Sequence, residues 1–315
     1  MSPSTMPSGS YRGRFAPSPS GPLHFGSLIA AVASYLDARS NQGSWLVRIE
    51  DIDTPRVVAG ADRDILHTLE AFALTWDEQP VYQSQRHTLY QDYLEHLHDS
   101  GLVYACQCTR KQIKAMGGHY NNHCRALSLP WQDNALRLQQ HFPVTQFQDA
   151  ILGDINVPPE LASEDYIIKR RDGLFAYQLV VVIDDIAQQI SHVVRGADLV
   201  EPTARQISLF RQLQQPEPLY AHVPLAVAKP GFKLSKQNHA PAIDKQQPLP
   251  TLHAAMRYLN IAVGELADYH NCQQLLEHAT TLFCRNSIPK VQEIQLNSTE
   301  KGQFSFQPLY PSTSI

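Results

Sequence analysis

The sequence of 315 residues has little of what a membrane protein, a secreted disulfide protein or a basic nucleic-acid coat requires. Basic residues are fewer than acidic ones, 26 against 30, so any nucleic-acid-binding face must be local. No apolar run approaches the roughly 20 residues of a membrane span. The Ser/Pro-rich residues 1–10 lack the charged and apolar segments of a signal peptide. We therefore expect a globular, cytoplasmic protein with a disordered N-terminal extension and no membrane partner.

Cysteine is also scarce, and the five cysteines cannot all pair with one another. Cys106, Cys108 and Cys124 lie close together in the sequence, whereas Cys272 and Cys284 lie far downstream on a stretch with helical character. This uneven arrangement favours a metal site over disulfides.

The three clustered thiols are good soft ligands for tetrahedral zinc, and a fourth ligand must come from a neighbour in the sequence. The neighbouring candidates are His119, Tyr120 and His123. Metal chemistry by itself favours a histidine.

Local patterns predict a β-loop-α-β unit at the start of the chain. A short strand over 11–16 leads into a Pro/Gly loop over 17–22, which can continue neither strand nor helix. Apolar residues then recur at helical spacing over 23–39, and a second strand is expected over 45–49.

A further buried strand is predicted over 179–183, because this unbroken apolar run resembles a central parallel strand covered on both faces. The region 104–165 is broken by glycines and prolines and reads as an insertion outside the sheet, while the end from 299 onward is polar and loop-like. Helices are expected over 61–72, 87–100, 252–259 and 272–284.

The loop before the first helix has the composition of a phosphate-binding site. It delivers His24, Gly26 and Ser27 to the first helical turn, where free N–H groups and the helix dipole attract a phosphate and Gly26 permits close approach to the backbone. Taken alone, the segment is equally compatible with an ordinary strand-to-helix connection.

A second polar loop contains Lys233, Ser235 and Lys236, where two lysines flank a hydroxyl. Such a group could grip a triphosphate and stabilise the charge that develops on a leaving pyrophosphate. A lysine pair on its own is usually just a solvated surface.

Together, the two segments resemble the paired signatures of class I aminoacyl-tRNA synthetases. Residues 24–27 stand for the "HIGH" element and residues 233–237 for the "KMSKS" element. The blocks 14–21, 48–53 and 194–198 look like those of glutamyl-tRNA synthetases. The resemblance covers residues 11–240 and implies a Rossmann-like parallel sheet.

The chain ends at Ile315, too soon after Gln237 for the helical anticodon-binding domain of those enzymes, so none is expected. A catalytic core with a Cys-x-Cys insertion is similar to a branch of the family that attaches glutamate to the queuosine base of tRNA(Asp). The resemblance therefore implies ATP and L-glutamate as substrates and queuosine-bearing tRNA(Asp) as the acceptor.

The resemblance also assigns a glutamate pocket. Guanidinium forks bind carboxylates bidentately, so Arg14 and Arg195 suit the substrate carboxylates, and Glu50 suits its ammonium. On sequence alone, an ordinary salt bridge between Arg14 and Glu50 is as compatible. The family usually has an asparagine where Val181 stands, so one polar contact to substrate is missing. The complete pocket is Arg14, Phe15, Ala16, Pro17, Ser18, Glu50, Tyr177 and Arg195.

For ATP, the resemblance implies that His24 and Lys236 are catalytic. His24 would hydrogen-bond phosphate oxygens, Lys236 would neutralise the leaving phosphates, and Mg²⁺ would accompany ATP. Asp184 and Asp185 are expected to be structural. The ATP-binding residues are His24, Gly26, Ser27, Lys233, Ser235 and Lys236.

The Cys-x-Cys and Tyr-x3-Cys spacing looks like the zinc site of the same branch. By that resemblance, one structural Zn²⁺ per chain is held by Cys106, Cys108, Tyr120 and Cys124, with His123 as the alternative to Tyr120.

The sequence thus predicts an α/β protein with a zinc-bearing insertion and a short helical C-terminal part. Two alternatives remain: a truncated glutamyl-tRNA synthetase that charges a tRNA 3′ end, and a non-catalytic zinc RNA-binding module. The second predicts damaged signature residues, and these are intact. The expected parts are an extension (1–10), a first half of the core (11–103), the insertion (104–165), a second half with the lysine loop (166–245) and the C-terminal part (246–315).

Overall fold

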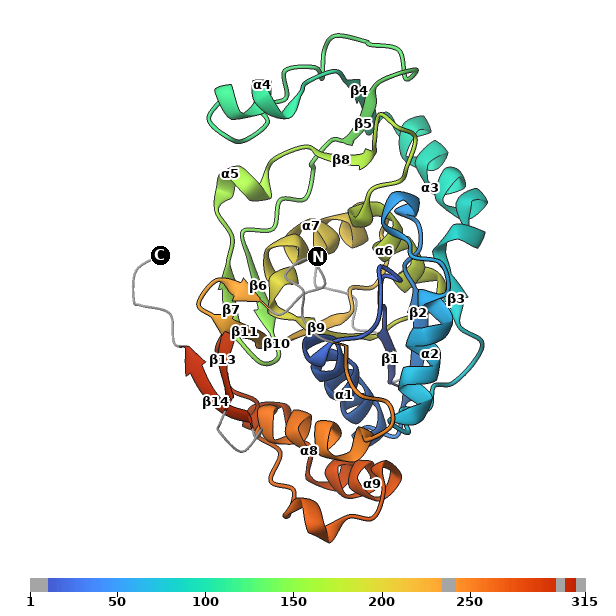
Figure 1. The fold of residues 1–315 in the computed structure, drawn as a ribbon. Helices are drawn as coiled ribbons and strands as arrows, with labels where there is room; N and C mark the ends of the chain where they lie inside the picture. The colour runs from blue at the N-terminus through green and yellow to red at the C-terminus, as the bar shows by residue number, and fades with distance from the viewer. Residues whose placement is uncertain (1–10, 234–241, 299–303, 310–315) are drawn as a thin grey trace.

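The computed structural model describes residues 11–233, 242–298 and 304–309 of the chain (Figure 1). Parallel strands lie at the centre, with the long helix α1 packed against them, a lobe of short strands at one end and helices α8 and α9 at the other. None of the helices in the described ranges is long and apolar enough to cross a bilayer.

The predicted β-loop-α-β unit is confirmed. It consists of β1 (Arg12–Phe15), α1 (Phe25–Ser40) and β2 (Ser44–Ile49), and β2 pairs in parallel with both β1 and β3 (Val81–Tyr82). A second parallel pair, β9 (His192–Gly196) and β10 (Leu219–Val223), lies beside β1.

Helix α1 is buried along most of its length, because the strands cover one side and the C-terminal helices cover another. The turn that follows it depends on Gly43, where a Cβ would lie 2.5 Å from atoms of Tyr11. Only a glycine lets the chain pass this close to β1 before β2 begins.

The prediction of a strand over 179–183 is wrong, because these residues belong to helix α6 (Tyr177–Ala187). The helix packs against α3 (His87–Asp99), α7 (Val200–Gln212) and β8 (Tyr166–Lys169). Residues 179–183 are therefore buried on all sides of the helix, and a short apolar run of that kind cannot be distinguished from a buried strand by periodicity.

The region after α3 forms a small antiparallel sheet of its own, in the order β4 (Val103–Cys106), β5 (Ala135–Leu138), β8. Its third strand extends to Lys169, four residues past the expected end of the insertion at 165. Helix α4 (Arg110–Ala115) follows β4, and helix α5 (Pro159–Ala162) precedes β8.

The hairpin of β6 (Gln146–Asp149) and β7 (Gly153–Asn156) also belongs to this region of the sequence, but it packs on the core. Its Phe147 shares a hydrophobic cluster with Leu46 of β2 and Val193 of β9. The hairpin therefore links the insertion to the central strands.

The C-terminal part is only partly helical. Helices α8 (Pro248–Tyr258) and α9 (Cys272–Leu282) match the expectation. Strand β13 (Glu293–Ser298) follows them, and β14 (Phe304–Leu309) corrects the expected loop-like end from 299 onward. These strands complete a sheet in the order β12 (Phe232–Lys233), β11 (Leu225–Lys229), β13, β14. Strand β13 pairs with β11, which lies far earlier in the chain, so the local sequence could not predict this pairing.

The remaining predicted helices are also present, as α2 (Ala61–Ala71) and α3. Single 3₁₀ turns occupy Thr54–Arg56, Gln83–Gln85, Ala197–Leu199, Leu266–Asp268 and Arg285–Ser287.

Candidate functional site

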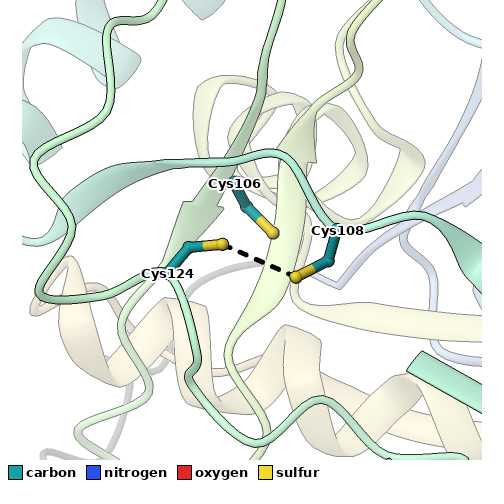
Figure 2. Close-up of side chains that lie close together, drawn as sticks. All are labelled: Cys106, Cys108 and Cys124. Carbon is teal, nitrogen blue, oxygen red and sulfur yellow. Dashed lines mark hydrogen bonds between the residues drawn. The ribbon is translucent and has the colours of Figure 1, made fainter. Parts of the chain in front are cut away.

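The three clustered cysteines converge in the structure (Figure 2). Their Sγ atoms lie within 4.8 Å of one another, and those of Cys108 and Cys124 are 3.5 Å apart. Cys106 ends β4, Cys108 follows two residues later, and the loop after α4 brings Cys124 back to them. In the described part of the chain, no histidine or carboxylate joins this group.

Tyr120 lies beside the cysteines and is buried, whereas His119 and His123 are exposed. Its hydroxyl accepts a hydrogen bond of 2.9 Å from the backbone N–H of Cys124. The hydroxyl of Tyr104, which donates to Asp165 at 2.6 Å, lies 3.3 Å away. The geometry therefore favours Tyr120 over His123 as the neighbour that could complete a metal site.

A buried cation faces the same cluster. The Arg137 side chain is buried, and its guanidinium carbon lies 3.7 Å from the centre of the Tyr120 ring. Its Nε has no hydrogen-bond partner, and none of the salt bridges among the described residues involves Arg137. A buried guanidinium without a carboxylate calls for another source of negative charge.

The pKa values of the thiols also indicate a metal site at this cluster. Burial raises the pKa of Cys106, but hydrogen bonding and charge from Arg137 outweigh this and lower it overall. Burial and the two neighbouring thiols raise the pKa of Cys108 to about 12. Three adjacent thiolates repel one another unless a cation lies between them, so this donor set fits a soft divalent metal such as zinc.

A separate cavity with a volume of about 460 Å³ opens at the carboxyl ends of β1, β2 and β9. Ligands bind at this edge of parallel sheets because the loops that follow the strands converge there. All eight residues predicted for the glutamate pocket line the cavity. Sequence reasoning did not assign several further lining residues to it: Ser20, Leu23, Ala30, Arg56, Val194, Gly196, Asp198 and Leu199.

Several of those residues had a signal in the sequence, because Ser20, Val194 and Gly196 lie within the family-like blocks 14–21 and 194–198. Asp198 closes the family-like block that contains Arg195, and Arg56 follows the block that contains Glu50 by a few residues. Val181, by contrast, does not line the cavity. It is buried in the hydrophobic cluster between α3 and α6.

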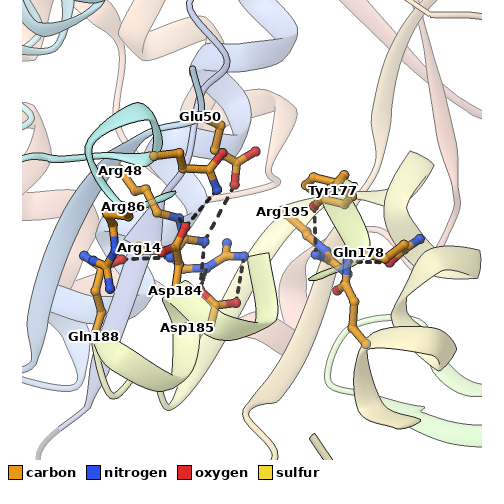
Figure 3. Close-up of polar contacts among 12 residues, drawn as sticks. Arg14, Arg48, Glu50, Arg86, Tyr177, Gln178, Asp184, Asp185, Gln188 and Arg195 are labelled. Carbon is orange, nitrogen blue, oxygen red and sulfur yellow. Dashed lines mark hydrogen bonds and ion pairs between the residues drawn. The ribbon is translucent and has the colours of Figure 1, made fainter. Parts of the chain in front are cut away.

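One wall of the cavity is backed by a network of buried ion pairs (Figure 3). Asp185 accepts from Arg14 Nε at 3.1 Å and lies 2.8 Å from Arg48 Nη2. Asp184 lies 3.0 Å from Arg86 Nε. Both aspartates are thus engaged by arginines, which fits the structural role expected of them.

Glu50 lies between this network and the cavity, which it lines, and its carboxylate is 3.7 Å from Arg48 Nη2. Burial raises the pKa of Glu50 to about 7, although the positive charges of Arg48 and Arg14 partly oppose the shift. The carboxyl group therefore titrates near neutrality, and a cationic ligand would favour its ionised form.

Arg195 lies on another wall and is held by uncharged groups. Its Nη2 donates to Thr203 Oγ1 and Gln206 Oε1, both at 2.7 Å. Its Nη1 lies 3.4 Å from the Tyr177 hydroxyl (Figure 3). Its Nε donates to His222 Nε2 at 3.1 Å. None of the salt bridges within the described ranges involves Arg195, so its charge is available to an anionic ligand.

A second cavity, with a volume of about 210 Å³, adjoins the first and shares several lining residues with it. His24, Gly26 and Ser27 line it at the start of α1, where the imidazole of His24 caps the helix by accepting from the Ser27 N–H. Residue 233 lies in β12, whereas Ser235 and Lys236 lie outside the described residues.

Comparison with known proteins identifies relatives of the whole chain. Residues 10–249 match the family described as tRNA synthetases class I (E and Q), catalytic domain. The chain is 56% identical to the glutamyl-Q tRNA(Asp) synthetase of Photobacterium profundum, over 92% of this chain and 93% of that protein. It is 52% identical to the protein of the same name from Serratia proteamaculans, over 95% and 98%.

A solved structure shares the fold. The glutamate tRNA ligase of Elizabethkingia meningosepticum, crystallised in complex with its amino acid, superposes with a TM-score of 0.76 at 24% identity. The match covers 91% of this chain and 67% of that chain. The α/β fold with its parallel strands is therefore that of a class I catalytic domain.

Proposed function

We propose, since the chain belongs to the class I tRNA synthetases for glutamate and glutamine (E and Q), that it activates L-glutamate with ATP and transfers it to queuosine in the anticodon of tRNA(Asp). Family membership makes the chain a ligase that transfers glutamate to tRNA. The proposal adds the chemical steps, the acceptor base and the residues that carry them. The name shared by the relatives at 52–56% identity supports the choice of acceptor.

The single observation that carries the choice of amino acid is the charge pattern of the larger cavity. Glutamate has two carboxylates and one ammonium, and the cavity walls hold Arg14, Arg195 and the carboxyl group of Glu50. Guanidinium forks match carboxylates, and Glu50 titrates where an ammonium can hold it ionised. Tyr177 and residues 15–18 complete the enclosure.

In the first step, a carboxylate oxygen of glutamate attacks the α-phosphorus of ATP, glutamyl-adenylate forms and pyrophosphate leaves. The adjoining cavity at the start of α1 suits the nucleotide, with Gly26 and Ser27 at its wall. His24 donates to phosphate oxygens and Lys236 neutralises the leaving pyrophosphate, and Lys233 and Ser235 are assigned to ATP binding with it. Mg²⁺ bound with ATP would offset phosphate charge.

In the second step, a hydroxyl of the modified base attacks the activated carbonyl, an ester forms and AMP leaves. No side chain is needed as a nucleophile, so the protein acts by positioning and electrostatics. The acceptor enters as an unstacked loop base, which is how proteins usually read single-stranded RNA.

The cysteine cluster is proposed to hold one structural Zn²⁺ through Cys106, Cys108 and Cys124, with Tyr120 as the fourth ligand. Three thiolates and a phenolate around Zn²⁺ leave a net negative charge, and Arg137 supplies the compensating cation. The ion would tie the loop after α4 to β4 and stabilise the insertion. The boundaries of that part at 104–165 and the cytoplasmic location stay predictions.

The experiment that tests the activation step is ATP–pyrophosphate exchange with each of the acidic amino acids and their amides. Exchange should depend on glutamate and should fall about 10²- to 10³-fold in Lys236→Ala, the typical cost of losing a contact that stabilises transition-state charge. A chain without any exchange would be the non-catalytic RNA-binding module.

Transfer is tested separately with tRNA(Asp) that carries queuosine or plain guanine. The proposal expects labelled glutamate on the queuosine form, and also on an isolated anticodon stem-loop that bears the modified base. Charging of unmodified tRNA at its 3′ end would identify a truncated glutamyl-tRNA synthetase instead.

A further inference from the structure

Two buried polar groups, Asp149 and His222, lie behind Arg195 and are not used directly in the proposed reaction. Asp149 comes from the end of β6, His222 from β10 and Arg195 from β9, and each side chain is at most 5% exposed. Asp149 Oδ2 lies 2.6 Å from His222 Nδ1, and Arg195 Nε donates to His222 Nε2 at 3.1 Å.

The direction of these hydrogen bonds fixes the state of the imidazole. The Arg195 Nε–H is always a donor, so His222 Nε2 accepts from it and is the unprotonated nitrogen. Thr203 Oγ1 also lies 3.2 Å from Nε2, but it donates its own proton to Leu199 O at 2.7 Å. The ring proton therefore lies on Nδ1, toward Asp149. The ring is then neutral. Burial and the positive charge of Arg195 lower the pKa of His222 although Asp149 opposes them, which agrees with this state.

The Asp149 carboxylate is itself held firmly. Its Oδ1 accepts backbone N–H groups of Ile151 at 3.0 Å, Leu152 at 2.8 Å and His222 at 3.2 Å. Its Oδ2 therefore always faces the imidazole. The β6–β7 hairpin thus dictates which nitrogen of His222 carries the proton.

A guanidinium has five N–H groups, and those of Arg195 are almost all committed. His222 accepts from Nε–H, and Tyr177 accepts from Nη1 at 3.4 Å. The two hydrogens on Nη2 are shared by Thr203, Gln206 and the backbone carbonyl of Leu199. One Nη1 N–H remains for a ligand in the cavity. The Nε contact holds the opposite edge of the guanidinium from the Nη2 contacts, so the two together fix the rotation of its plane.

We propose that Asp149 and His222 are positioning residues that hold the guanidinium of Arg195 in the orientation that receives a glutamate carboxylate. The inference rests on the proposed function, because it assumes that Arg195 binds the amino acid. It predicts that the tautomer of a histidine outside the cavity controls the apparent affinity for glutamate.

Two substitutions of His222 separate its two contacts. In His222→Gln, the side-chain oxygen can still accept from Arg195, but the contact to Asp149 is lost. In His222→Asn, the amide can still donate to Asp149, but it is too short to reach Arg195. We expect the glutamate KM to rise about 10- to 100-fold in His222→Asn, the range typical of a lost hydrogen bond to a charged group, and less in His222→Gln.

A third variant changes the tautomer without changing shape. In Asp149→Asn, the three backbone N–H groups hold the side-chain oxygen at the Oδ1 position, so the amide nitrogen must face His222 Nδ1. It donates there, the ring proton moves to Nε2, and Nε2 can no longer accept from Arg195. The glutamate KM should rise as in His222→Asn.

The measurement is steady-state ATP–pyrophosphate exchange with varied glutamate and varied ATP, together with a melting temperature for each variant. We expect kcat within about threefold of the unmodified chain and an unchanged KM for ATP, since only binding of the amino acid is affected. His253→Asn is the matched control, because His253 is another buried histidine and hydrogen-bonds Gly264 O away from the cavity.

A role confined to stability would make the glutamate KM follow the melting temperature across all four variants. That result, or a normal KM in both His222→Asn and Asp149→Asn, would overturn the proposal. If the unmodified chain shows no exchange with glutamate, the proposed function fails. In that case, calorimetry measures how tightly glutamate binds to the unmodified chain and to each variant, and weaker binding in the variants would still support the positioning role. If the unmodified chain does not bind glutamate either, the positioning role fails too.

Discussion

The two arginines of the amino-acid cavity are held in opposite ways. Arg14 is paired with the carboxylate of Asp185, which also neutralises Arg48 behind it. Arg195 is surrounded by a neutral imidazole, hydroxyls and an amide, and none of the described salt bridges involves it. The first wall is electrostatically complete without a ligand. The second becomes complete only when an anion binds.

The cysteine cluster resembles the Arg195 wall in this respect. Arg137 is buried against thiols and a phenol, and no carboxylate among the described residues pairs with it. Charge that the protein leaves unbalanced therefore indicates a missing ligand, an anion at Arg195 and a metal complex at Arg137. Breaking each arrangement should have a different consequence.

The largest effect is expected at the cysteine cluster. The purified chain should contain about one zinc, and Cys106→Ser should lose nearly all of it and destabilise the insertion, because binding of structural zinc contributes of the order of 10 kcal/mol in zinc-dependent folds. Metal analysis and thermal unfolding measure both effects. Cys284→Ser is the control, since that cysteine is exposed and lies outside the cluster.

The same assay identifies the fourth ligand. Loss of zinc in Tyr120→Phe supports the phenolate, whereas unchanged zinc there with loss in His123→Ala supports the histidine. A purified chain without any metal would contradict the site as a whole.

The next largest effect is expected in the ion-pair network. Asp185→Asn removes the carboxylate that the buried Arg14 and Arg48 share, and breaking a buried pair in this way costs about 3–5 kcal/mol. Asp172→Asn breaks the exposed pair with Arg170 and should cost at most about 1 kcal/mol. Chemical denaturation measures the difference. Equal losses in the two variants would mean that the network does not stabilise the cavity wall.

The contrast between the two walls could be predicted only in part from the sequence. The β-loop-α-β unit was visible because helical periodicity and the Pro/Gly loop are local signals. Its strands place Arg14 and Glu50 at one edge of the sheet, and β9, which lies beside β1, places Arg195 there as well. Helix α6 was mistaken for a strand, because burial on every side removes the periodicity that separates the two.

The residues that support the site were not visible for a related reason. Asp149, His222 and Arg137 have no motif around them, and their roles arise from contacts between strands that are distant in the sequence. The same holds for β13 and β14, whose partner strand lies far upstream. Sequence patterns thus located the groups that would touch substrate, but not the groups that orient them.

A smaller effect is expected from Arg195→Ala. Removing the guanidinium should raise the glutamate KM about 10- to 150-fold, the range for hydrogen bonds to charged groups, with little change in kcat. Exchange kinetics measure both constants. Arg211→Ala removes an exposed arginine that pairs with Glu217 and should leave them unchanged. A fall in kcat alone would contradict the assignment of Arg195 to a substrate carboxylate.

The smallest effect concerns Glu50, on the wall that is already balanced. Because burial raises its pKa to about 7, Glu50 is protonated below neutrality and cannot pair with the substrate ammonium. The glutamate KM should therefore rise about 10-fold as the pH falls from 8 to 6, one pH unit on either side of that pKa. Glu50→Gln should have a raised KM that does not vary with pH in this range. The Glu50→Gln variant should also fold normally. The buried site already holds a neutral carboxyl group below pH 7, and burying the ionised carboxylate is what costs folding free energy above pH 7. A pH dependence that persists in Glu50→Gln would assign the titration to another group and leave the ammonium without its partner.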